Sequence, residues 1–231
     1  MNDFIMIIDT ETTNSIEQPL PYDIGYAIVD LYTGNIILER SYVVAEVFLD
    51  KGLMLSAYYA DKVPKYWKGI KKGERVLTSF LKIRSQIKKD MEHYHITKVG
   101  AYNASFDNRA TNNDTRYITS SRLRWFFPYG TEIFCIWNMA CTSILPTIEY
   151  ITFCLENGFV SEKGNIQTSA ETVYRYITNN PNFEEKHMGL EDVRIETAIF
   201  LHILKSGLEY DSKPCSGCWM KVREAKKSFN L

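Results

Sequence analysis

The sequence predicts an α/β fold with a mixed sheet, and two observations support this class. Strand-like runs dominate the first fifty residues, and strands then alternate with helical segments. A chain of 231 residues is long enough for one sizeable core and short for two. We therefore expect one domain over residues 1–210, with residues 211–231 as a short basic tail that packs on it or extends it.

The first strand is predicted from the apolar run Phe4–Ile8, which is followed by Asp9, Thr10 and Glu11. Because side chains alternate along an extended chain, Asp9 and Glu11 point to one side and Thr10 to the other. Two like charges held this close are costly unless a cation neutralises them. The strand end therefore indicates a divalent metal, although an Asp-x-Glu pair alone is more often a solvated strand end.

Two β-prone runs follow, Asp23–Asp30 and Ile36–Phe48, and a Thr-Gly-Asn turn joins them. This pattern is typical of a hairpin. We therefore expect the first three strands of the sheet to be antiparallel.

The segment from Tyr58 to Lys72 interleaves aromatic residues with lysines, and Pro64 is expected to break any helix there. A solvated amphipathic face and a surface that contacts a nucleic-acid strand remain equally good interpretations. Beyond it, apolar residues recur at helical spacing from Glu74 to Met91, which predicts an amphipathic helix.

The second half of the chain predicts a strand over Thr97–Tyr102, a turn at Asn103–Asp107 and a helix after it. Thr168 to Glu171 has the spacing of a capping box and predicts a helix start. The last long helix is predicted over Leu190–Ser206. Since ligands gather at strand ends in such folds, Asp107 is expected near Asp9 and Glu11, although Asp107 alone could equally be a helix cap.

Composition sets limits on function. A formal net charge of -1 excludes a globally basic nucleic-acid binder, although local basic surfaces remain possible. We find no apolar run near 18 residues and no basic-then-apolar leader, so we expect a cytoplasmic protein that does not enter a membrane. The five cysteines are expected to be reduced thiols. Cys215 and Cys218 have the spacing of half a zinc site, but no second pair follows, so a turn is favoured over zinc.

The last candidate group is His187 with Asp192, a histidine before the final helix and an acid in its first turn. With these residues the sequence resembles the DEDDh (DnaQ-like) family of 3′-to-5′ exonucleases, which have a ribonuclease H-like fold. Asp9 to Thr13 resembles the first family motif, Asn103 to Asp107 the second, and His187-x4-Asp192 the third. Asn14 stands where that family often has glycine, and asparagine tolerates a left-handed backbone, so the turn is expected to survive.

The resemblance implies a two-metal phosphodiester hydrolase that uses Mg²⁺ or Mn²⁺, ions that hard oxygen ligands suit. Asp9 would bridge both ions, Glu11 and Asp192 would complete one ion site, and Asp107 would serve the other. His187 would act as the general base, because an imidazole pKa near 6.5 suits proton removal near neutral pH. The motifs also imply substrate contacts from four further residues, namely Thr12, Thr13, Asn103 and Phe106.

The expected activity is 3′-to-5′ exonucleolytic release of nucleoside 5′-monophosphates from single-stranded nucleic acid, with DNA favoured over RNA. Such an enzyme would trim ends in proofreading or repair, and a DNA polymerase or replication complex is a candidate partner. An RNA 3′ exonuclease similar to ribonuclease T or oligoribonuclease is the alternative. From another class, a non-catalytic nucleic-acid-binding relative is possible, but a pure binder has no need for His187.

Overall fold

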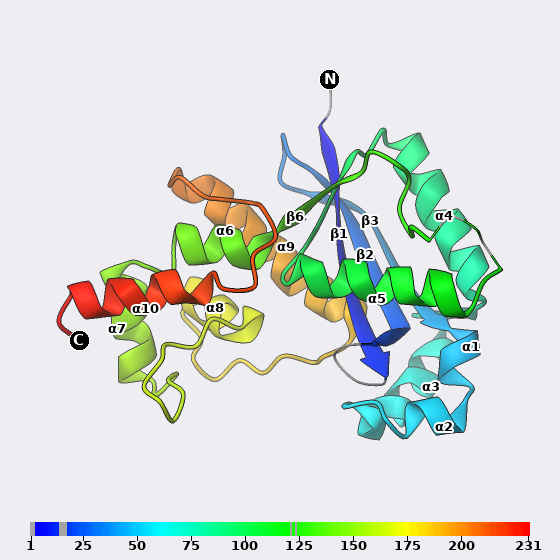
Figure 1. Cartoon of the computed structure of the whole chain (residues 1–231), viewed down its shortest axis with the longest axis horizontal. Helices are drawn as coiled ribbons and strands as arrows, with labels where there is room; N and C mark the ends of the chain where they lie inside the picture. The colour runs from blue at the N-terminus through cyan, green and yellow to red at the C-terminus, as the bar shows by residue number, and fades with distance from the viewer. Residues whose placement is uncertain (1–2, 14–17, 121, 123) are drawn as a thin grey trace. The chain divides into compact units, whose positions relative to one another are not determined.

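The computed structural model describes residues 3–13, 18–120, 122 and 124–231, so the turn expected at Asn14 lies outside the described residues. The chain divides into two compact units (Figure 1). The first, here called the sheet unit, comprises Met1–Gly100, Phe106–Ile133 and Lys186–Val193. The second, called the helical unit, comprises Ala101–Ser105, Phe134–Glu185 and Arg194–Leu231. The domain boundary expected at residue 210 stays a prediction.

A mixed six-stranded sheet with the order β4-β3-β2-β1-β5-β6 organises the fold. The strands are β1 (Phe4–Thr13), β2 (Leu20–Asp30), β3 (Ile36–Val44), β4 (Val76–Thr78), β5 (Lys98–Ala101) and β6 (Glu132–Cys135). The first three strands are antiparallel, as predicted, whereas β5 runs parallel to β1 and β4 parallel to β3. The predicted mixed α/β class is therefore confirmed.

The apolar half of β1 lies in the core, with Ile5 to Ile8 at most 2% exposed. Because β2 pairs with one edge of β1 and β5 with the other, this strand is held on both sides. The parallel pairing with β5 involves Met6 and Ile7 only, so the carboxyl end of β1 extends beyond it. A central strand thus carries Asp9 and Glu11 in the part that extends beyond β5 while still pairing with β2.

Helices surround this sheet and build the helical unit. Those of the sheet unit are α1 (Ala45–Phe48), α2 (Lys51–Met54), the 3-10 helix η1 (Ala60–Lys62), α3 (Val63–Lys72) and α4 (Phe80–His93). Two helices have residues in both units, α5 (Ala104–Tyr117) and α9 (Gly189–Ser206). The helical unit adds α6 (Ile136–Thr142), α7 (Ile148–Glu156), α8 (Ala170–Ile177) and α10 (Trp219–Ser228). Figure 1 shows α1 to α3 grouped beside the carboxyl end of β1.

Several predicted element boundaries are wrong. The strand predicted over Ile36–Phe48 ends at Val44, and Ala45–Phe48 forms a helix. The helix predicted from Glu74 begins only at Phe80, because Val76–Thr78 pairs with β3 and becomes an edge strand. Tertiary pairing of β-branched residues here overrides a helical period.

Two predictions about helix starts also need correction. Pro64 does not prevent a helix, because it occupies the first turn of α3, where its missing N–H costs no hydrogen bond. The N-cap of α8 is Ser169 rather than Thr168, and the Ser169 side chain accepts a hydrogen bond from the Thr172 N–H. Both corrections move a boundary without changing the element type.

The basic tail has regular structure, because residues from Trp219 form α10 in the helical unit. Cys215 is exposed and Cys218 is buried, and the residues between them lie in the turn before α10. None of the described helices is both long and apolar enough to cross a bilayer.

Asp114 on α5 provides a pH-dependent prediction. Its side chain is fully buried, and neither carboxyl oxygen has a hydrogen-bond partner among the described residues. Burial, reinforced by the Glu46 carboxylate, raises the pKa of Asp114 well above its ordinary value. Between the unfolded and the folded pKa the folded state binds more protons, so the free energy of unfolding falls as pH rises. We expect Asp114→Asn to remove this loss, with a gain in Tm over wild type that is larger at pH 8 than at pH 4. Equal pH profiles for the two proteins would contradict the assignment.

Candidate functional site

The candidate site begins at the carboxyl end of β1. Asp9 and Glu11 are half-buried, whereas Thr10 between them is 6% exposed. This alternation agrees with the prediction that the two carboxylates share one side of the strand. The pairing register with β2 shifts between Glu11 and Thr12, so an irregularity in the strand follows directly after the second carboxylate.

The first turn of α9 supplies the second part of the site. His187 precedes the helix with a positive φ of 48°, a left-handed conformation that is uncommon for this residue type. The Asp192 carboxylate accepts a hydrogen bond of 2.7 Å from the Met188 N–H, and Asp192 is 5% exposed. The carboxylate therefore satisfies one of the free amides at the helix start and is fixed in orientation.

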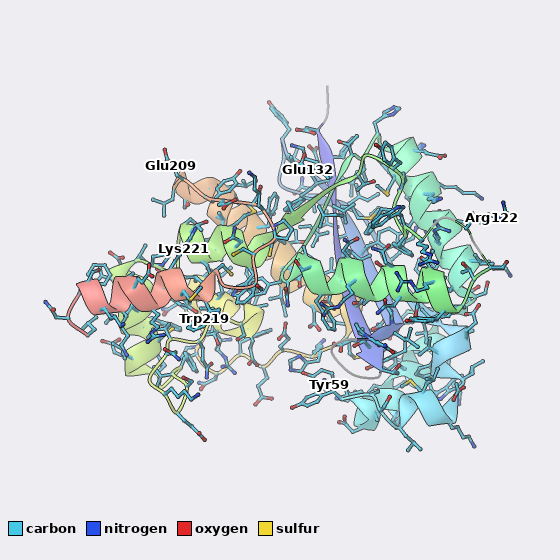
Figure 2. The ribbon with its side chains drawn as sticks, viewed as in Figure 1. Tyr59, Arg122, Glu132, Glu209, Trp219 and Lys221 are labelled. Carbon is cyan, nitrogen blue, oxygen red and sulfur yellow. The ribbon has the colours of Figure 1, made fainter. Side chains whose placement is uncertain are left out.

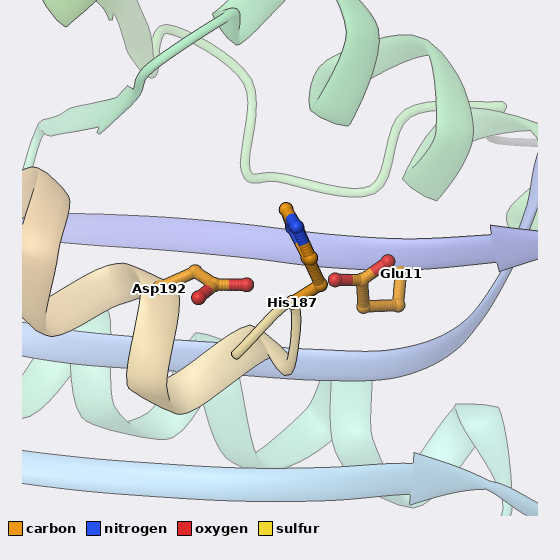
Figure 3. A group of neighbouring side chains, drawn as sticks. All are labelled: Glu11, His187 and Asp192. Carbon is orange, nitrogen blue, oxygen red and sulfur yellow. The ribbon is translucent and has the colours of Figure 1, made fainter. Parts of the chain in front are cut away.

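The structure brings Glu11, His187 and Asp192 together, although 176 residues separate the first from the second (187 − 11). Each offers one ligand atom, and these three atoms lie within 4.8 Å of one another. Figure 3 shows the two carboxyl groups pointing toward each other, with the His187 side chain between them. All three residues belong to the sheet unit.

A close backbone contact holds α9 against the sheet. A Cβ atom on Gly25 would lie 2.3 Å from the Gly189 carbonyl carbon and from the Leu190 nitrogen. A Cβ on Gly189 would in turn lie 2.8 Å from the Gly25 nitrogen. Since Gly25 pairs with Asp9 in the sheet, this contact sets the start of α9 beside the part of β1 that carries Asp9 and Glu11.

A buried ion pair also holds the start of α9 against the sheet. Asp23 on β2 is fully buried and accepts hydrogen bonds from the Gly189 N–H at 2.9 Å and from the Tyr66 hydroxyl at 2.7 Å. Arg75 lies 3.1 Å from the same carboxylate and also pairs with Glu191 in the first turn of α9. Burial raises the pKa of Asp23, while the Arg75 guanidinium and these hydrogen bonds act in the opposite direction.

Asp107 reaches the same strand from α5. Its Oδ1 accepts hydrogen bonds from the Thr10 N–H at 3.1 Å and from the Thr10 hydroxyl at 2.8 Å. Asp107 is 5% exposed, and burial raises its pKa to about 7 despite these bonds. The structure thus attaches Asp107 to the residue between the two predicted metal ligands, and its role as a ligand stays a prediction, as does that of Asp9.

The four predicted substrate contacts differ in accessibility. Asn103 is exposed, and Thr12 and Phe106 are half-buried. The Arg109 guanidinium lies over the Phe106 ring, 5.6 Å from its centroid. Thr13 is fully buried and its hydroxyl donates to the Leu20 carbonyl at 3.4 Å, so it has little surface to offer a substrate. Substrate binding by these residues stays a prediction.

Sequence reasoning missed Tyr59 and Lys62 as neighbours of the site. The Tyr59 ring stacks on the His187 imidazole with centroids 4.4 Å apart and an interplanar angle of 11°. The Lys62 ammonium lies 3.9 Å from the Tyr59 centroid and donates to the Lys186 carbonyl at 2.7 Å. Figure 2 labels Tyr59 in the turn that precedes η1.

The available signal was the alternation of aromatic residues and lysines between Tyr58 and Lys72, for which two interpretations were open. Lys62 is only 8% exposed, which rules out a fully solvated face at this position. Burial lowers the pKa of Lys62, and the Glu11 and Asp192 carboxylates oppose that shift. Spacing alone could not show that one aromatic of the segment contacts the predicted base.

The Gly25 contact yields a direct prediction. In Gly25→Ala the new methyl group must displace backbone atoms of Gly189 and Leu190, which moves His187 and Asp192 relative to Glu11. A misplacement of about 1 Å at such a site can cost about 10²-fold in rate, and overpacking costs about 1–3 kcal/mol of stability. We expect a loss of activity of that order in a protein that still melts cooperatively. Gly52→Ala is the matched control, because its methyl group would approach only the Asp50 side chain, at 3.2 Å.

Comparison with solved structures places this fold among DEDDh exonucleases. The chain matches a 3′-exonuclease that recognises the 3′ end of a histone mRNA stem-loop, with a TM-score of 0.58, 14% identity, and coverage of 94% of this chain and 88% of that one. It also matches the nuclease domain of 3′hExo, a DEDDh family member bound to rAMP, with a TM-score of 0.55, 14% identity, and coverage of 92% and 96%.

A third similar structure is the zinc-bound complex of E. coli ExoI with single-stranded DNA, with a TM-score of 0.55 and 12% identity. That match covers 90% of this chain and 41% of ExoI. At such identities the likeness establishes a shared ribonuclease H-like fold. No protein-family model matches the sequence, and no curated protein matches it either.

The donor set fits a divalent metal. Two carboxylates and an imidazole converge within 4.8 Å, and carboxylate oxygens are the ligands that Mg²⁺ and Mn²⁺ prefer. The Met188 N–H orients one of these carboxylates, as outer hydrogen bonds do for metal ligands. The geometry therefore supports Glu11 and Asp192 as candidate ligands, with Asp9 two positions earlier on β1, and their role as ligands stays a prediction.

Proposed function

We propose that the protein is a metal-dependent 3′-to-5′ exonuclease that acts on single-stranded nucleic acid. The observation that carries this proposal is the convergence of Glu11, His187 and Asp192 on a fold shared with DEDDh exonucleases. Glu11 comes from β1, whereas His187 and Asp192 come from the start of α9, and the motif resemblance assigns all three to one site. The function class is thus supported independently by sequence pattern and by geometry.

In the proposed mechanism Glu11, Asp192, Asp9 and Asp107 hold two Mg²⁺ or Mn²⁺ ions, which supply Lewis-acid stabilisation of the phosphate charge. His187 accepts the proton of the attacking water at an imidazole nitrogen. Tyr59 keeps the imidazole in one plane by stacking on it, and Asp192 stays fixed through the Met188 N–H. Each cycle releases one nucleoside 5′-monophosphate.

DNA is the favoured substrate in this proposal, with proofreading or repair trimming as its use and a polymerase or replication complex as partner. RNA is the second candidate, and the similarity to an exonuclease that recognises a histone mRNA stem-loop favours it. The 2′-hydroxyl is what a binding pocket reads to tell the two apart. Both candidates use the same metal site and the same bond cleavage.

The test compares matched single-stranded DNA and RNA oligonucleotides of one sequence, labelled at the 5′ end, with Mg²⁺ and with EDTA. We expect a ladder that shortens from the 3′ end in Mg²⁺ only, and faster on DNA. Faster degradation of RNA would establish the alternative substrate. Tight binding of both oligomers without any ladder would indicate a non-catalytic relative and would refute the enzyme proposal.

A further inference from the structure

An aromatic cavity lies on the sheet unit beside the start of α5. It has a volume of about 260 Å³ and lies between α5 and the segment that leads to β6. Its lining combines two carboxamides with three aromatic rings, contributed by Asn108, Asn112, Trp125, Phe127 and Tyr129. Asn108 directly follows Asp107 in sequence, so the helix that carries a predicted metal ligand also lines this cavity.

The backbone beneath the cavity is firmly fixed. Arg84 on α4 is 9% exposed, and its guanidinium donates to the Phe126 carbonyl at 3.1 Å and also to the Trp125 carbonyl. The Phe126 N–H donates to the Asn112 side chain at 2.7 Å, and the Phe126 ring packs 5.5 Å from that of Phe80. The segment is therefore anchored to both α4 and α5.

The same fixed segment exposes two of its other aromatic side chains. Trp125 is 64% exposed and Tyr129 is fully exposed. Tyr129 lies in a turn closed by the Thr131 N–H and hydroxyl, which both donate to the Pro128 carbonyl, and Gly130 supplies the positive φ of 85°. Trp and Tyr side chains have only two rotatable bonds, so they lose little entropy when a planar partner stacks on them.

The charge of this segment indicates which class of partner it binds. Residues 116–131 contain three arginines, Arg116, Arg122 and Arg124, and no Asp or Glu. All three are exposed, and Figure 2 shows the Arg122 side chain pointing away from the ribbon. Arginines next to exposed aromatic rings form the combination that binds phosphates and stacks bases of single strands.

We propose that this surface, made of Arg122, Arg124, Trp125 and Tyr129 with Asn108 and Asn112, binds the single strand upstream of the 3′ end that the proposed metal site receives. Bases stack on Trp125 and Tyr129, one base enters the cavity, and Arg122 and Arg124 contact phosphates. The inference rests on the proposed function, because the strand is the substrate of the same chain. The surface would make the enzyme prefer long strands over dinucleotides.

The experiment measures affinity for a long single-stranded oligonucleotide by fluorescence anisotropy with Ca²⁺ in place of Mg²⁺, and turnover of both the long strand and a dinucleotide in Mg²⁺. We expect Trp125→Ala with Tyr129→Ala to weaken binding of the long strand by about 10-fold or more and to lower its kcat/KM similarly. Dinucleotide turnover should change by less than about twofold, since a dinucleotide does not extend to these rings.

Controls separate stacking from loss of fold. The double variant Trp125→Phe with Tyr129→Phe keeps two rings and should retain the affinity of wild type. Tyr32→Ala removes a tyrosine that is 91% exposed on the β2–β3 turn and should change nothing. Arg122→Ala with Arg124→Ala should weaken binding and reduce its salt dependence by about one counterion for each arginine.

Unchanged affinity for the long strand in the alanine double variant would overturn the proposal, as would equal losses on the long strand and the dinucleotide. The anisotropy measurement needs no hydrolysis. A wild-type protein that binds through these rings but cleaves nothing would therefore refute the exonuclease proposal and leave this one standing.

Discussion

Asp9→Ala is expected to abolish hydrolysis of a 3′-labelled oligonucleotide in Mg²⁺, with a loss on the order of 10³-fold or more. Asp9 lies two residues before Glu11 on β1, and the motif resemblance implies that it would serve both ions. Without metal, the variant removes one of several carboxylates that repel each other. The Tm of the metal-free variant should therefore equal or exceed that of wild type.

The combination of lost activity and retained stability separates a metal ligand from a structural residue. Asp3→Ala is the control, because it removes an exposed carboxylate just before the same strand. Normal release of label by Asp9→Ala would sink the site assignment. A drop in the Tm of the metal-free protein together with the lost activity would instead assign Asp9 a structural role.

His187→Ala is expected to lower turnover by about 10²–10⁴-fold, the usual contribution of a general base, with little change in metal affinity. The alternative is a metal ligand, since the His187 imidazole lies within 4.8 Å of both carboxylate ligand atoms. The two roles differ in a Mg²⁺ titration followed by the metal-dependent rise in Tm. Parallel losses of turnover and metal affinity would contradict the general-base role.

The backbone at His187 calls for a second variant. Its φ of 48° lies in the left-handed region, which asparagine adopts more readily than alanine. His187→Asn should therefore keep the turn while removing the base, and it should match His187→Ala in turnover. His202→Ala is the histidine control, because His202 lies on α9 in the helical unit.

Local patterns predicted much of the sheet and of the acidic positions. The apolar run before Asp9 and the hairpin that joins the runs Asp23–Asp30 and Ile36–Phe48 depend on neighbours in sequence, so the antiparallel strands were predictable. The edge strand at Val76 was not, because three residues become a strand only when β3 pairs with them. The apolar residues within Val76–Thr78 do have helical spacing in the sequence, but in the structure they form a strand.

The supports of the candidate site were harder to predict than its ligands. Asp23, Arg75 and Glu191 come from three separate segments, and each alone has the appearance of an ordinary surface charge. The Tyr59 ring and the His187 imidazole are 128 positions apart (187 − 59), so only the folded chain reveals their stacking. Motif spacing predicts which groups bind metal, whereas the residues that position them leave no local pattern.

The buried contacts among Asp23, Arg75 and the Gly189 amide have a consequence for metal exchange at the proposed site. In these contacts the Arg75 guanidinium neutralises the Asp23 carboxylate, so the start of α9 needs no metal ion to stay on the sheet. Chelation should then remove metal without moving the residues around the site. Metal should rebind without a refolding step. The residues that would hold the metal are thus ordered when the chain folds, so metal binding itself costs little further conformational entropy.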